Sequence, residues 1–165
     1  MTEAPLARNG KPVESVWDYP RPPRLEAVDW RIVVRHHGTT IVDAPSAVRV
    51  LETSQPPAYY IDPRFVDLTR LTVNDHHTVC EWKGTATYAD INVDGVTVPR
   101  AAWSYPDPTD AFESIAGWWA FYAQLLDECS VDGERVTPNE GTFYGGWITA
   151  NVTGPFKGAP GTANW

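Results

Sequence analysis

Only two cysteines, Cys80 and Cys129, occur among the 165 residues of this chain, and they lie far apart. No run approaches the roughly 18 consecutive apolar residues that a membrane-spanning helix needs. The N-terminal sequence MTEAPLARNG also lacks the apolar stretch of a secretion signal. We therefore expect a cytoplasmic protein without membrane contact, in which the reducing compartment keeps both thiols free.

Basic residues are also in short supply, because 13 Lys and Arg stand against 21 Asp and Glu and give a formal net charge of −8. Proteins that bind nucleic acid need a basic stripe that displaces counterions from the phosphate backbone. The one basic cluster, between Arg21 and Arg35, is interrupted by Glu26 and Asp29. We therefore expect no nucleic-acid partner. The acidic surface predicts solubility but does not identify a partner or an oligomeric state.

Aromatic residues, by contrast, are abundant, with 8 Trp and 7 Tyr. Their rings bury large areas, while their N–H and O–H groups need hydrogen-bond partners, so they collect at pocket walls and interfaces as well as in cores. A chain of this length normally forms one domain whose core needs no metal or disulfide. The many indoles therefore favour either an aromatic-lined pocket or exposed tryptophans that bind another protein.

Strand-forming residues dominate the chain from residue 31 onward. Apolar and β-branched segments flank three turn sequences that predict hairpins, namely His37-Gly38, Asp94-Gly95 and Asp132-Gly133. Further strands are expected from β-branched and aromatic runs at 59–61, 78–82, 101–105 and 118–122. These signals together predict a mainly β fold.

Helical signals are few and short. Thr109 is a suitable N-cap for a short helix over 110–116, which Gly117 would end. The apolar residues of segment 47–51 also have helical spacing. We expect one or two short helices in all.

The two ends of the chain differ in composition from its middle. Residues 1–29 contain several prolines, which resist helix and donate no ladder hydrogen bond, so we expect an irregular N-terminal extension. Residues 30–126 are expected to form the core domain. Residues 127–165 are expected to add a C-terminal hairpin and a Gly-rich tail. Aromatic residues alternate with the glycines there, so this tail should wrap the same domain.

The segment from Cys80 to Gly84 is the densest group of reactive side chains. On a strand, Cys80 and Trp82 would share one face, and Lys83 would leave the strand where Gly84 allows a bend. A catalytic cysteine needs a nearby positive charge, which Lys83 could supply. The alternative is an ordinary buried thiol among strand hydrophobes. Glu52 is similarly either a ligand-facing carboxylate or a solvated charge.

Metal binding is not supported by the sequence. The four histidines form two adjacent pairs, His36-His37 and His76-His77. Adjacent strand residues point to opposite faces, so neither pair is expected to chelate by itself. CxxC and HxxxH spacings are absent, so we expect no metal and no cofactor.

Two blocks carry a family resemblance: Cys80-Glu81-Trp82-Lys83-Gly84 and Ala102-Trp103-Ser104-Tyr105-Pro106. With Leu51-Glu52, the segment 59–63 and Ala120-Phe121-Tyr122, they resemble the bacterial domain-of-unknown-function family 427. The resemblance implies a β-tent (Mss4-like) fold, in which two antiparallel sheets lean together around a pocket. The family label also suggests nucleotidyl transfer, but the paired carboxylates and Gly-Ser motif of that chemistry are absent from this chain.

The resemblance also implies which positions belong to the site. Matched to its motifs, the candidate ligand-binding residues are Glu52, Tyr60, Cys80, Trp82, Lys83, Trp103 and Tyr105. Trp103 and Tyr105 are two apart on a predicted strand, so they should share a face, with Glu52 and Lys83 at the rim of the pocket.

The leading hypothesis is that the protein binds a small molecule in this aromatic-lined pocket between two sheets. One alternative is an enzyme that uses Cys80 or Lys83 as nucleophile. Another is a protein-interaction domain that uses exposed tryptophans.

Overall fold

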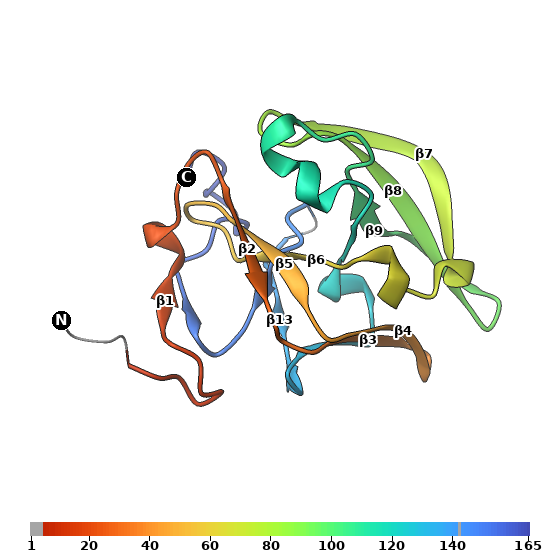
Figure 1. Ribbon diagram of the computed structural model, residues 1–165, viewed down its shortest axis with the longest axis horizontal. Coiled ribbons are helices and arrows are strands. Elements are labelled where there is room, and N and C mark those ends of the chain that lie inside the picture. The colour runs from red at the N-terminus through yellow and green to blue at the C-terminus, as the bar shows by residue number, and fades with distance from the viewer. Residues whose placement is uncertain (1–4, 142) are drawn as a thin grey trace.

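The computed structural model describes residues 5–141 and 143–165. Most of the secondary structure in this part of the chain is β-strand, and nearly all strand pairs are antiparallel (Figure 1). The predicted mainly β fold with antiparallel sheets is therefore confirmed. No helix among the described residues is long and apolar enough to cross a membrane.

Three sheets form the body of the protein. The first has the strand order β10–β9–β8–β7, over Trp119–Phe121, Val96–Ser104, Gly84–Val93 and Leu71–Cys80. The second has the order β12–β11–β3–β4, over Glu134–Arg135, Glu128–Val131, Ile32–His36 and Thr39–Ala44. The third has the order β2–β5–β6, over Arg24–Val28, Ala47–Leu51 and Ala58–Tyr60.

The three predicted hairpin turns are confirmed, and each connects neighbouring strands of one sheet. Both turn residues have a positive φ in every case, as at Asp94 (52°) and Gly95 (77°) between β8 and β9. Positive φ at both positions is the geometry of a type I′ turn, whose twist matches that of paired strands. Gly and Asp tolerate this geometry, so the local sequence is sufficient to specify the turn.

The helical segments of the described chain are 3₁₀ turns, η1 to η5, over Val16–Asp18, Pro63–Phe65, Leu68–Arg70, Asp110–Ile115 and Ala123–Leu125. The helix predicted over 110–116 is present as η4, directly after Thr109. It is kinked at Phe112, where φ is −115°. Gly117 follows it with a φ of 74°, as expected of a residue that ends a helix.

Two segments differ from the prediction because their partners lie elsewhere in the chain. Ala47–Leu51, whose spacing indicated a helix, is strand β5 and pairs with β2 and β6 on its two sides. Arg24–Val28, which we expected within an irregular extension, is strand β2. Ladder hydrogen bonds to a distant strand outweigh weak local signals, and local spacing does not reveal them.

Two clusters of buried side chains hold the sheets together. The larger cluster contains aliphatic and aromatic residues of all three sheets, among them Ile32, Tyr59 and Ile91. The smaller cluster is richer in aromatic rings and includes Tyr60 of β6 and Trp103 of β9. This second cluster joins the third sheet to the first, and it surrounds the site described below.

The tail lies against the body through two short strand pairs. Strand β15 (Val152–Thr153) pairs in parallel with β1 (Glu14–Ser15), and β14 (Trp147–Ile148) pairs with β13 (Thr137–Pro138). The Trp147 indole is buried, stacks on Tyr59 at 5.2 Å between centroids, and donates to the Phe121 carbonyl at 2.9 Å.

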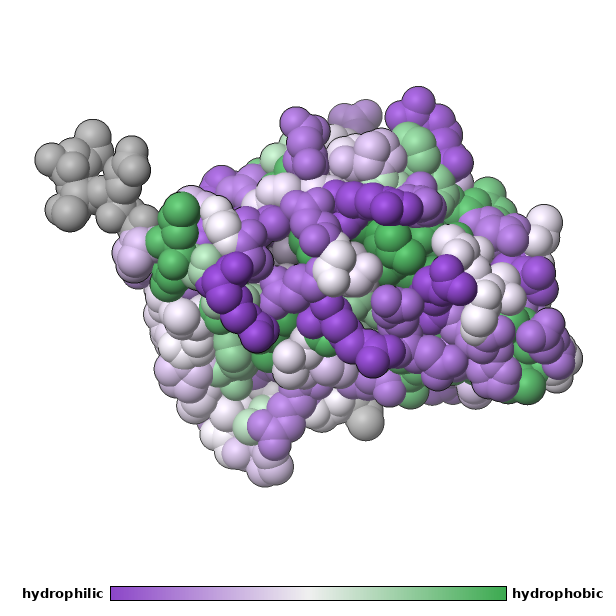
Figure 2. All heavy atoms as spheres, turned by 90° about the horizontal axis from the view of Figure 1, so that it is seen from below, coloured by the Kyte–Doolittle hydropathy of each residue, from purple (hydrophilic) through white to green (hydrophobic). Residues whose placement is uncertain are grey.

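The outer surface is mostly hydrophilic on the face shown in Figure 2.

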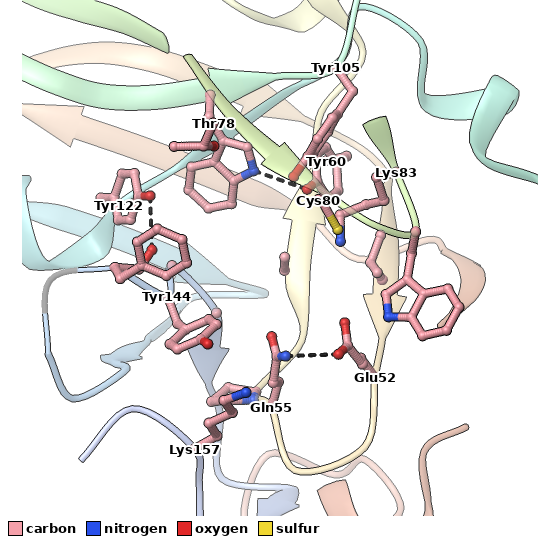
Figure 3. Close-up of a pocket in the computed structure, with 18 of the residues that line it drawn as sticks. Glu52, Gln55, Tyr60, Thr78, Cys80, Lys83, Tyr105, Tyr122, Tyr144 and Lys157 are labelled. Carbon is pink, nitrogen blue, oxygen red and sulfur yellow. Dashed lines mark hydrogen bonds between the residues drawn. The ribbon is translucent and has the colours of Figure 1, made fainter. Parts of the chain in front are cut away.

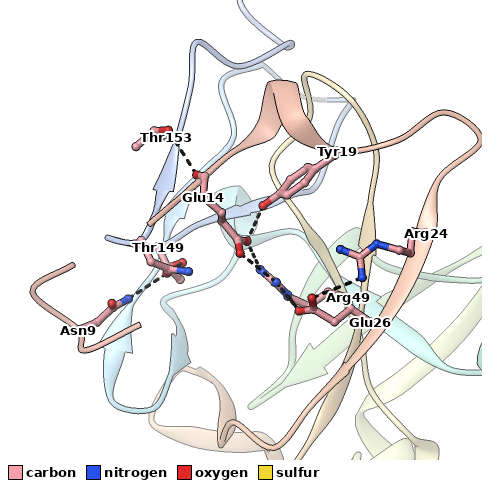
Figure 4. A network of polar contacts seen from close by, with 9 residues as sticks. Asn9, Glu14, Tyr19, Arg24, Glu26, Arg49, Thr149 and Thr153 are labelled. Atoms are coloured by element: carbon pink, nitrogen blue, oxygen red, sulfur yellow. Dashed lines mark hydrogen bonds and ion pairs between the residues drawn. The ribbon is translucent and has the colours of Figure 1, made fainter. Parts of the chain in front are cut away.

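A buried ion cluster fixes the N-terminal segment to the third sheet (Figure 4). Arg49 of β5 is 1 % exposed, and its guanidinium donates to Glu14 Oε1 at 2.6 Å and to Glu26. The Tyr19 hydroxyl donates to the same Glu14 oxygen at 2.6 Å. Because a buried charge without a partner is very costly, Arg49 keeps both carboxylates close and so ties β1 and β2 to β5.

Replacing Arg49 with Met should lower the free energy of unfolding by about 1.5–3 kcal/mol, because charge-assisted hydrogen bonds to the partly solvated carboxylates of Glu14 and Glu26 are lost. Arg31→Met is the matched control, since Arg31 donates to Asp43 at 2.8 Å but both side chains are exposed. That variant should lose less than about 1 kcal/mol. Urea unfolding of both variants measures the difference, and equal losses would contradict the assignment.

Candidate functional site

A cavity of about 280 Å³ lies between the first and third sheets (Figure 3). Strands β5 and β6, with the loop after β5, form one wall, and β7, β8, β9 and the turn at 81–83 form another. Residues 143–146 and 157 of the tail form the third. The structure brings all seven predicted site residues to this cavity: Glu52, Tyr60, Cys80, Trp82, Lys83, Trp103 and Tyr105.

Trp103 joins the walls of the cavity. Its Nε1 donates to the Tyr60 hydroxyl at 3.0 Å, and the two rings meet edge to face at 6.2 Å between centroids. The Tyr122 ring lies 4.6 Å away between centroids. Gly145 of the tail packs so closely that a Cβ there would lie 2.3 Å from Trp103 Cη2. The indole is therefore enclosed by both sheets and the tail.

The segment from Cys80 to Gly84 differs from its prediction. Strand β7 ends at Cys80, and residues 81–83 form a turn closed by Gly84, whose φ is 104°. The expectation that Cys80 and Trp82 share a strand face is therefore wrong, although both line the cavity. Thr109 holds the turn, since its hydroxyl donates to the Trp82 carbonyl at 2.6 Å and its N–H to the Lys83 carbonyl at 3.1 Å.

Lys83 is buried rather than at the rim, with 9 % of its surface exposed. Its ammonium lies 5.6 Å from the Tyr105 ring centroid and 5.9 Å from that of Phe112. Among the described residues it has no ion pair and no hydrogen-bond acceptor. Figure 3 shows that the Lys83 and Cys80 side chains point into the same part of the cavity.

The tyrosine hydroxyls around the cavity are uncharged donors. Burial is the main cause that raises the pKa of Tyr60, Tyr105 and Tyr122 above its ordinary value, so the three phenols keep their protons. Tyr122 donates to the Phe143 carbonyl at 3.0 Å. The Tyr105 hydroxyl forms no hydrogen bond with any residue that the structure describes.

Glu52 already has partners in the protein. Its Oε2 accepts from Gln55 Nε2 at 3.0 Å and lies 3.5 Å from Arg21 Nε. The charge of this carboxylate is therefore largely balanced before any ligand arrives. The sequence left two roles open for Glu52, ligand contact and solvated charge. The structure adds a third, because these contacts hold the loop after β5 in place.

The third wall contains residues that the sequence reasoning did not assign to the site. Tyr144, Gly145, Gly146 and Lys157 all come from the Gly-rich tail. The alternation of glycine and aromatic residues there indicated a segment that packs on the domain. It did not indicate which face the segment covers, because that depends on contacts with Trp103 and with the carbonyl of Pro56.

The first histidine pair also differs from its prediction. His37 lies in the hairpin turn with a φ of 48°, so its ring stays beside that of His36, with 4.7 Å between centroids. Asp127 accepts from the His37 N–H at 2.8 Å. One donor atom from each of the three side chains lies within 4.8 Å of the others. Divergence of adjacent side chains holds along a strand but not across this turn.

The part of the chain that supplies the two sheet walls matches a known family. Residues 24–132 match the model described as Domain of unknown function (DUF427). The chain belongs to this family. Its resemblance to the family is thus confirmed, whereas the tail wall of the cavity lies beyond the matched residues. No curated protein matches the chain.

The two thiols should differ in reactivity. Burial, with Glu128 nearby, raises the pKa of Cys129 to about 12, so at pH 8 only about one thiol in ten thousand is ionised. Cys80 is half-buried and lines the cavity. Iodoacetamide at pH 8 should therefore modify Cys80 in the native protein and Cys129 only after denaturation. Peptide mass spectrometry over time measures both, and comparable native rates would contradict the assignment.

Metal removal should leave the fold intact. In the described part of the chain, the one group of three possible ligands is His36, His37 and Asp127, of which the last two are exposed. Structural zinc is instead held by four ligands in a closed site. Treatment with EDTA should therefore leave the Tm unchanged. Stoichiometric zinc in the purified protein, with unfolding on chelation, would contradict this expectation.

Proposed function

We propose that this protein binds a small organic molecule in the cavity between its first and third sheets. The observation that carries the proposal is a partly open cavity with an aromatic wall, in which some polar groups have no partner among the described residues. Ligand pockets combine such apolar walls with a few fixed polar groups. The volume of about 280 Å³ lies near the lower end of the roughly 300–1,000 Å³ usual for such pockets, which favours a ligand of one or two rings.

The other two hypotheses have less support. The Cys80 thiol forms no hydrogen bond with a described residue, so no described general base activates it in the manner of a catalytic thiol. An interaction surface of tryptophans is also not favoured, because among the described tryptophans only Trp17 is among the exposed large hydrophobic residues. Its Nε1 donates to the Pro155 carbonyl at 2.8 Å, so the indole also has a role within the fold.

The architecture is consistent with the β-tent (Mss4-like) group that the resemblance implies. Two antiparallel sheets contribute facing walls of one cavity, and Tyr60 and Trp103 join them. We propose that the protein has this fold and that it resides in the cytoplasm, where a reducing environment would keep its two cysteines as free thiols.

Trp103→Phe should abolish most of the ligand response of the cavity. The readout is the thermal shift produced by hits from a screen of small cyclic amides, amines, nucleosides and ring acids. The variant also loses the bond to Tyr60, so a stability loss of about 1–3 kcal/mol is expected from one hydrogen bond and a small void.

Trp147→Phe provides the matched control. This indole is also buried and donates one bond of similar length, 2.9 Å to the Phe121 carbonyl, but it does not line the cavity. It should lose comparable stability and keep the ligand response. If both variants keep the response, or both lose it in proportion to stability, Trp103 is a core residue only and the proposal fails.

A further inference from the structure

We propose that the ligand of this cavity carries an acid group, a carboxylate or a phosphate, which is bound by the ammonium of Lys83 and the hydroxyl of Tyr105. The inference rests on the proposed function and narrows it to a class of ligand. It starts from the unpaired groups inside the cavity.

The ammonium of Lys83 is the first of these groups. An ammonium has three N–H donors and is rarely buried without a carboxylate. The Lys83 residue is 9 % exposed, and its ammonium lies over the rings of Tyr105 and Phe112 without an ion pair to a described residue. Aromatic faces attract the cation but accept no strong hydrogen bond, so the donors stay available to a ligand in the cavity.

The hydroxyl of Tyr105 is the second group. Burial is the first cause that raises the pKa of this phenol, and the neighbouring tyrosines add to it, so the oxygen remains protonated. It has no hydrogen-bond partner among the described residues, although the side chain is only 6 % exposed. A protonated phenol and an ammonium that line the same cavity offer donors to one oxygen-rich acceptor, which is how proteins bind carboxylates and phosphates.

The remaining charges around the cavity agree with an anionic ligand. Lys157 lies on the opposite side, 5.2 Å from the Tyr144 ring centroid, and also has no ion pair with a described residue (Figure 3). Glu52 is held by Arg21 and Gln55, and Glu81 is exposed at the turn. Positive charge without a protein partner is therefore concentrated inside, which disfavours the cationic ligand that Glu52 alone would favour.

The test is an NMR screen of single-ring fragments in which each acid is matched with its neutral amide and its amine, for example benzoate, benzamide and benzylamine. Phenyl phosphate and similar esters form a second acidic arm, which separates phosphate from carboxylate ligands. Backbone amide shifts of Gly145 and Gly146 report occupancy of the cavity, since both residues line it.

Three variants separate binding from folding. Lys83→Met keeps the length and the apolar stem but removes the charge, and Lys83→Arg restores a charge. Lys11→Met is the control, because Lys11 also lies over an aromatic ring, 4.8 Å from the Trp30 centroid, but far from this site and paired with Asp132. Unfolding of each variant by urea shows whether it is folded before titration.

Most fragments that bind should be acids. Lys83→Met should weaken the affinity of these acids by at least about tenfold, since a hydrogen bond to a charged group is lost. Lys11→Met should leave them unchanged, Lys83→Arg should restore part of the affinity, and added salt should weaken acids but not amides. This inference would be overturned if amides or amines bound as tightly as their acids, or if Lys83→Met did not change the affinity of the acids. Either result would still agree with the proposed function. Absence of any fragment at Gly145 and Gly146 would overturn both.

Discussion

The bond from the Trp103 indole to the Tyr60 hydroxyl is a side-chain link between the first and third sheets at the cavity, in addition to the backbone bridge between Ile61 and Trp119. Both residues are almost fully buried, with 6 % and 1 % of their surfaces exposed, so an unmet N–H there would carry the full cost of desolvation. The bond sets the distance between β6 and β9 at the cavity. The Tyr105 and Tyr122 rings pack on this pair, so it also helps to position these two wall residues.

The tail supplies the third wall of the cavity, beside the two walls that the sheets form. Glycine at 145 and 146 lets the backbone approach the Trp103 ring and the Pro56 carbonyl more closely than any side chain would allow. The tail then remains attached through β15 and through the Lys157 N–H, which donates to the Ser54 carbonyl at 2.7 Å. A segment with little secondary structure of its own thus becomes the third wall of the cavity.

Features set by local chemistry could be predicted from the sequence. The turns at Asp94-Gly95 and Asp132-Gly133 need only residues that tolerate positive φ, and Trp103 and Tyr105 share a cavity because side chains two apart on an extended chain point the same way. The family resemblance identified Glu52, Tyr60 and Lys83 as site residues, and all three line the cavity. Features set by distant partners could not be predicted: β5 and β2 form because they pair with each other.

The errors at single residues have similar causes. Cys80 and Trp82 were placed on one strand, but Gly84 and the two bonds from Thr109 convert the segment into a turn. The rings of His36 and His37 lie close together because His37 has a positive φ in the His-Gly turn. The rule that adjacent side chains point to opposite faces holds only for extended strands. The place of Lys157 follows from how the tail crosses Ser54, and no spacing within the tail reveals that.

Because the tail supplies the third wall of the cavity, occupancy of the cavity by any ligand would be thermodynamically linked to docking of the tail. A ligand that touches Tyr144 or Lys157 binds only the docked form, so its binding free energy adds to the stability of that form. The same linkage reduces the apparent affinity by the fraction of molecules in which the tail is undocked. The sheets alone, without residues 143–146 and 157, would present a groove with two walls.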